Sequence, residues 1–141
     1  MKKIIAIVIL SISLHSCIKE QEVNGSKEDF NGKWTLSRMS SSRPNTETTG
    51  EARVWQESYT FSKDSTFTKT RVENEKSTTV SGTFSFKKET DGEYLILTHA
   101  KKTELIGSCM GNLQEILYFS DKNTLSSTWK NCDGPGLEYN K

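Results

Sequence analysis

The chain has 141 residues, of which 19 are lysine or arginine and 18 are aspartate or glutamate, so its formal net charge is +1. This near-balance leaves no basic stripe that could follow phosphates, which argues against nucleic acid as a partner. Because only 33% of the residues are hydrophobic, the chain must bury its apolar side chains economically.

Residues 1–16 predict a secretory signal peptide. Lys2 and Lys3 form a short basic start, and the apolar run Ile4–Leu14 follows. This run is well short of the roughly 20 residues that a membrane-spanning helix needs. Removal of the signal peptide takes two lysines from the 19 basic residues, which leaves 17 against 18 acidic residues and a net charge of −1.

The signal peptide ends in Leu14-His15-Ser16-Cys17, which resembles the bacterial lipobox. The resemblance implies that Cys17 becomes the mature N-terminus and carries a lipid. We therefore expect a lipoprotein of the cell envelope, held at the outer membrane by this lipid and facing either the periplasm or the cell surface. The alternative is an ordinary signal peptide followed by a chance cysteine.

Residues 17–29 predict a flexible tether between the lipid and a folded domain. The segment Ile18–Asp29 is charged, has two aliphatic residues and shows no periodicity, as is typical of a flexible linker. Lys19-Glu20 resembles the acidic export signal of surface-exposed lipoproteins in Bacteroidota. An ordinary solvated linker explains the same two residues.

Cys109 and Cys132 are the two cysteines that remain after Cys17. An even pair of cysteines in an exported domain most often forms a disulfide. Closing a loop of about 22 residues would stabilise the fold by roughly 3 kcal/mol. A metal-binding or redox-active pair is the alternative, but the two cysteines lack a C-x-x-C spacing and a nearby histidine.

Residues 30–141 predict one all-β domain of about 110 residues. Apolar and polar residues alternate in short runs separated by turn signals, and no amphipathic helix is indicated. Between the first two expected strands lies a long polar loop, Ser40–Arg53, and residues 131–141 form a tail. The expected strands are 33–39, 55–61, 66–72, 79–86, 94–98, 102–106, 113–119 and 124–130.

Eight strands joined in sequence by hairpins favour an up-and-down antiparallel barrel. Gly32-Lys33-Trp34 at the head of the first strand, the long polar loop and the hairpins resemble the lipocalin family. More closely, they resemble the lipocalin-like domains of small bacterial lipoproteins. This resemblance implies that Trp34 plugs the closed end of the barrel under a basic side chain, for which Lys130 is the nearest candidate.

Closure of the barrel requires the first strand to pair with the last, because otherwise both edges stay exposed. We expect the partner to be the strand Thr124–Lys130. Trp34 should then be buried close to that strand, and its Nε1–H should find an acceptor.

Catalysis has little support in the sequence. After cleavage His99 is the remaining histidine, at a strand end and without a sequence-local partner, and the acidic residues are interpreted as solvated faces. Phosphate-loop, metal-ligand and serine-nucleophile motifs are absent from the sequence. We therefore expect a protein that is not an enzyme and that uses neither a metal nor a cofactor.

Two functions remain open for a domain that we expect to be monomeric. In the first, the barrel interior binds a small apolar ligand and Ser40–Arg53 acts as a lid. In the second, the barrel is solid and its surface acts in interaction, inhibition or immunity; a cavity of about 300 Å³ or more would favour the first. The candidate cavity-lining residues, which could equally be simple core, are Trp55, Tyr59, Phe61, Phe84, Phe86 and Leu117.

Overall fold

The computed structural model describes residues 30–41 and 46–141. The predicted signal peptide, the lipid attachment site Cys17 and the tether of residues 17–29 lie outside the described residues. Within the described part of the chain, no helix has the length and apolar character required to cross a membrane.

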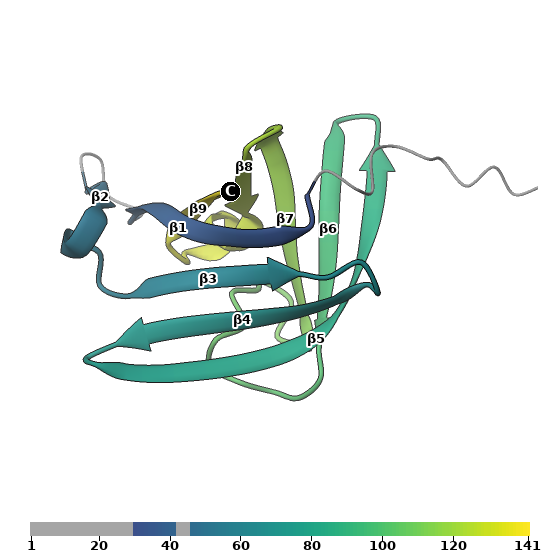
Figure 1. Ribbon diagram of the computed structural model, residues 1–141. Coiled ribbons are helices and arrows are strands. Elements are labelled where there is room, and N and C mark those ends of the chain that lie inside the picture. Colours follow the sequence, from purple (N-terminus) through teal and green to yellow (C-terminus); the bar gives the residue numbers. More distant parts are fainter. Residues whose placement is uncertain (1–29, 42–45) are drawn as a thin grey trace, which may run out of the picture.

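In the described residues, eight antiparallel strands close a barrel in up-and-down order, as predicted (Figure 1). The barrel closes because β1 pairs with β3 on one side and with β9 on the other. The loop after β1 holds a two-residue strand, β2 (Thr48–Thr49), and a 3₁₀ helix, η1 (Gly50–Ala52). The barrel strands are β1 (Gly32–Ser40), β3 (Gln56–Phe61), β4 (Thr66–Glu73), β5 (Lys76–Glu89), β6 (Gly92–His99), β7 (Gln114–Asp121), β8 (Thr124–Ser127) and β9 (Gly136–Asn140).

Successive side chains of each strand point alternately into the barrel and out to solvent. In β5, Val80 and Phe84 are buried as predicted. Gly82 lies between them, where a Cβ atom would come within 2.1 Å of the Thr98 carbonyl oxygen. Only glycine allows β6 to approach β5 this closely.

Trp34 is fully buried, and its Nε1–H donates to the Phe30 carbonyl oxygen at 2.7 Å, so the predicted burial and the predicted acceptor are both confirmed. The Phe30 ring packs against other aromatic side chains of the core, with ring centroids 5.5 Å from Phe84 and 6.1 Å from Phe61. The prediction that Lys130 covers Trp34 is wrong, because Lys130 Nζ lies over the Tyr118 ring and donates to its hydroxyl.

The strand that closes the barrel was predicted wrongly. The segment Thr124–Lys130 leaves the sheet after Ser127, where the Ser127 hydroxyl accepts from Trp129 N and starts the 3₁₀ helix η2 (Thr128–Cys132). The closing strand is β9, which was expected to be a tail. Its Leu137 and Tyr139 alternate inward and lie opposite Met39 and Leu36 of β1.

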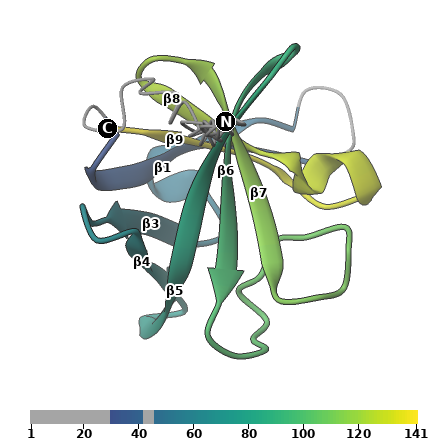
Figure 2. The ribbon, with the colours of Figure 1, turned by 90° about the vertical axis from the view of Figure 1, so that its right-hand side faces the viewer.

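The prediction of a strand at Lys102–Ile106 is also wrong. This segment belongs to a loop, residues 100–113, between β6 and β7 (Figure 2). Local hydrogen bonds hold it in turns: Leu105 N donates to the Thr103 hydroxyl, and Ile106 N donates to the Thr103 carbonyl. Leu105 is nevertheless buried, so the loop packs against the barrel.

Candidate functional site

The inside of the barrel carries a cluster of charged side chains, which we call the buried network. Its members occupy inward-facing positions of four strands and are between 0% and 9% exposed. They are Glu57 on β3, Lys69 and Arg71 on β4, His99 on β6 and Glu115 on β7.

Lys69 lies at the centre of the buried network, between two carboxylates. Its Nζ is 2.9 Å from Glu115 Oε1 and 3.3 Å from Glu57 Oε1. It also donates to the Leu105 carbonyl oxygen at 2.6 Å. The loop of residues 100–113 is thereby fastened to the interior of the barrel.

Each carboxylate of the network has further donors. Glu57 accepts from Arg71 Nε and from the Tyr139 hydroxyl, both at 2.6 Å. Glu115 lies 3.0 Å from His99 Nε2 and accepts from Gly107 N at 3.2 Å. The charges are thus paired and hydrogen-bonded, as buried charges must be.

The buried network shifts the pKa of Glu115 and of two neighbouring tyrosines. Burial raises the pKa of the Glu115 carboxyl, but the charge of Lys69 and hydrogen bonds from His99 and Lys69 outweigh burial and hold that pKa below its ordinary value. Burial and the nearby carboxylates raise the pKa of Tyr139 and Tyr59 well above the ordinary value. At neutral pH, Glu115 is therefore ionised, and Tyr139 keeps the proton that it donates to Glu57.

The prediction that the acidic residues lie on solvated faces is wrong for Glu57 and Glu115, which are buried. His99 does lie at the end of a strand, but it is buried against Glu115. The alternation of side chains along the strands, which repeats every two residues, could have indicated this burial. Glu57 lies two residues from the buried Tyr59 and so on the same face of β3, and Lys69 lies two residues from the buried Phe67 on β4.

The six candidate cavity-lining residues lie in or against the hydrophobic core. Tyr59, Phe61, Phe84 and Leu117 are buried there, and the Phe61 and Phe84 rings contact each other with centroids 5.2 Å apart. Phe86 and Trp55 are partly buried. Phe86 lines a hollow of about 340 Å³ at the Phe30 end of the barrel, and Trp55 stacks under Arg71, whose guanidinium carbon is 4.2 Å from the centre of the indole.

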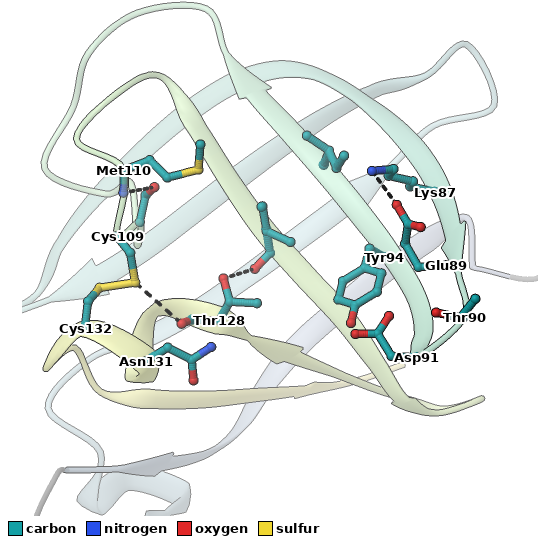
Figure 3. A pocket seen from close by; sticks show the side chains of 13 residues that line it. Lys87, Glu89, Thr90, Asp91, Tyr94, Cys109, Met110, Thr128, Asn131 and Cys132 are labelled. Atoms are coloured by element: carbon teal, nitrogen blue, oxygen red, sulfur yellow. Dashed lines mark hydrogen bonds and ion pairs between the residues drawn. A yellow bond between two sulfur atoms is a disulfide. The ribbon is translucent and has the colours of Figure 1, made fainter.

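A groove of about 730 Å³ lies on the outer face of the barrel, where β6 and β7 run side by side (Figure 3). We call it the outer groove. It is lined by Lys87, Glu89, Thr90, Asp91, Tyr94, Ile96, Ser108, Cys109, Met110, Ile116, Thr128, Asn131 and Cys132.

One end of the outer groove is apolar. Ile96 and Ile116 are directly paired across β6 and β7 and face outward, so they form its floor. Met110 is 57% exposed beside them. The Cys109–Cys132 disulfide forms a wall of the same groove (Figure 3).

The other end of the outer groove is polar. Lys87 and Glu89 form an ion pair at this end, and Asp91 and Tyr94 lie beside it (Figure 3). A hydrogen bond with Asp91 raises the pKa of the Tyr94 hydroxyl. Because Lys87 is matched by Glu89, this end carries the negative charge of Asp91.

The predicted disulfide between Cys109 and Cys132 is present, with Cα atoms 5.6 Å apart. It joins the loop of residues 100–113 to η2 and so holds the C-terminal segment against the barrel. It is also what gives the outer groove a covalently fixed side.

Within residues 30–41 and 46–141, no group of three or more histidine, cysteine, aspartate or glutamate side chains is placed to hold a metal ion. Comparisons of the chain with protein-family models, with curated proteins and with solved structures found no match.

Proposed function

We propose that this chain is a lipid-anchored lipoprotein of the bacterial cell envelope whose lipocalin-like barrel binds a small, partly apolar ligand in the outer groove. The observation that carries the ligand-binding part is the groove itself. Its volume of about 730 Å³ lies within the roughly 300–1,000 Å³ typical of small-molecule sites. Inside the barrel, by contrast, aromatic side chains and the buried network contact one another.

The outer groove suits a ligand with an apolar body and a polar head. An apolar group of the ligand would cover Ile96 and Ile116 on the floor and exclude water from them. This burial is favourable by about 25 cal/mol for each Å² of apolar surface removed from water. Met110 and the disulfide sulfurs are polarisable and adapt to irregular shapes. The groove is built on a hydrogen-bonded sheet and bordered by a disulfide, and such a preformed site needs little ordering on binding.

Asp91 at the polar end gives the ligand an orientation. Its carboxylate favours a hydrogen-bond donor or a cationic group on the ligand head, placed beside the Tyr94 ring. Specific small-molecule sites combine a mainly apolar lining with a few placed polar groups in this way.

A solid barrel that acts through its surface is the second candidate. Met110 and Leu113, which are 57% and 38% exposed, lie in the loop that borders the outer groove. Exposed apolar side chains beside a groove are typical of protein contacts when they form a continuous patch. In that case a side chain of a partner protein would enter the groove.

The fluorescent probe N-phenyl-1-naphthylamine tests the ligand site, because its emission rises in apolar surroundings. We expect saturable binding to the purified protein and a loss of affinity of about tenfold or more in Ile96→Glu, since a carboxylate on the groove floor opposes apolar burial. Thr98→Glu is the matched control: Thr98 is exposed on the same face of β6 but does not line the groove.

If the protein shows no saturable probe binding, the small-ligand function is wrong and the surface function is favoured. If Ile96→Glu and Thr98→Glu bind the probe equally well, binding occurs elsewhere on the molecule and the outer groove is not the site.

The anchor is tested at Cys17, which the lipobox resemblance makes the lipid attachment site. We expect Cys17→Ser to abolish labelling with palmitate and to move the protein from the membrane to the soluble envelope fraction. The control Cys109→Ser/Cys132→Ser should keep its label. A Cys17→Ser variant that is still labelled and stays in membranes would overturn the lipoprotein proposal, and protease treatment of intact cells would show which side the domain faces.

A further inference from the structure

A second hollow, of about 320 Å³, opens where the β4–β5 turn meets the loop of residues 100–113. We call it the end hollow. It does not share any lining residue with the outer groove. Its lining residues are Arg71, Glu73, Asn74, Lys76, Thr78, Glu104 and Leu105.

Arg71 connects the end hollow to the buried network. Its side chain is only 10% exposed, and its Nε donates to Glu57 Oε2 at 2.6 Å. The guanidinium stacks on Trp55 with 4.2 Å between the guanidinium carbon and the ring centre. The ion pair and the stacking hold the guanidinium in one orientation.

This stacked pair contains two buried donors that lack an acceptor. Arg71 Nη2 and Trp55 Nε1 are both shielded from solvent, and neither has a hydrogen-bond partner in the described residues. Both groups can only donate, and a buried donor without an acceptor is destabilising. The partner that Arg71 requires is an acceptor, and the planar guanidinium can form paired hydrogen bonds with the two oxygens of a carboxylate.

The other charges of the end hollow have both signs. Lys76 adds a positive charge, whereas Glu73 and Glu104 add two negative charges, and all three side chains are exposed. A simple anion would be attracted by Arg71 and Lys76 but repelled by the two carboxylates. A molecule that carries a carboxylate and an ammonium group matches both sets of charges.

We propose that the end hollow binds a small zwitterion, such as an amino acid, whose carboxylate is held by Arg71 and Lys76 and whose ammonium group faces Glu73 and Glu104. The hollow is at the lower end of the size range for small-molecule sites, which suits such a ligand. This site does not depend on the outer groove.

Nuclear magnetic resonance of the indole N–H groups tests the proposal. The probes are ω-amino acids from glycine to 6-aminohexanoate, each compared with the unsubstituted carboxylic acid of the same chain length at constant ionic strength. We expect the Trp55 indole resonance to move saturably with one length of amino acid, bound about fivefold more tightly than its plain carboxylate. The Trp34 indole, which donates to Phe30, is the internal reference and should not move.

Two variants locate the binding without disturbing the buried network. Glu104→Gln should weaken binding of the amino acid about fivefold, whereas the plain carboxylate should bind no more weakly than before, because the variant removes a charge that repels it. Glu75→Gln is the matched control, because Glu75 lies in the adjacent turn but does not line the end hollow. The proposal is overturned if no probe moves the Trp55 resonance saturably, if the plain carboxylates bind as tightly as the amino acids, or if both variants behave alike.

Discussion

Replacement of Lys69 with methionine is expected to lower the free energy of unfolding by about 3–5 kcal/mol, because it leaves buried carboxylates without their counter-charge. Lys69 Nζ lies within 3.3 Å of oxygens of both Glu57 and Glu115, and all three side chains are 0% exposed. Methionine has a similar length and shape, so lost packing should contribute little. Urea denaturation at neutral pH measures the change.

Lys88→Met is the control for removal of a lysine charge. Lys88 pairs with Glu93 at 3.1 Å, but its side chain is 57% exposed, and surface pairs contribute about 0–1 kcal/mol. The double variant Lys69→Met/Glu115→Gln should lose less stability than the sum of its single variants, since one unpaired carboxylate is then removed. A loss in Lys69→Met no larger than that in Lys88→Met would contradict the role given to the buried network.

Truncation of Trp34 to alanine should cost about 3–5 kcal/mol, the typical loss for a fully buried aromatic side chain. This is a large share of the roughly 5–15 kcal/mol that keeps a small domain folded. Trp34 is 0% exposed, and its ring packs against Phe119 with centroids 6.1 Å apart. The expected result is a sharp fall in the melting temperature, measured by circular dichroism.

Trp55→Ala is the comparison for Trp34→Ala, because Trp55 is only partly buried. It should cost less stability than Trp34→Ala, although it removes the ring beneath Arg71. If Trp34→Ala melted at the temperature of the unchanged protein, Trp34 would not be the plug of the barrel and the resemblance to lipocalins would lose its main support.

The barrel could be predicted from the sequence because the alternation of residues in strands such as β5 and β6 is a local property. The closing strand β9 could not be recognised in the same way. It has five residues after Gly134 and Pro135, and the two that face inward, Leu137 and Tyr139, give too short a pattern. Its pairing with β1 joins residues about 100 positions apart, which local alternation does not encode.

The disulfide was predictable because the expected lipid attachment at Cys17 leaves only one possible pairing, Cys109 with Cys132. The buried network was not, because the charge of Glu57 or Glu115 normally indicates exposure. Lys69 and Glu115 are 46 residues apart in the chain, and their contact depends on the barrel being closed. The floor of the outer groove likewise depends on a pairing between distant residues, because the register of β6 and β7 places Ile96 beside Ile116.

The most direct test of whether a ligand occupies the outer groove or the barrel interior is methyl nuclear magnetic resonance during a titration with N-phenyl-1-naphthylamine. Neighbouring residues of β6 and β7 face opposite sides of the sheet: Ile96 and Ile116 line the outer groove, whereas Leu95, Leu97 and Leu117 are buried inside. We predict that the two isoleucine methyl signals move saturably while the three leucine signals stay in place. Movement of the leucine signals with the isoleucine signals unchanged would place the ligand inside the barrel and contradict the outer-groove proposal.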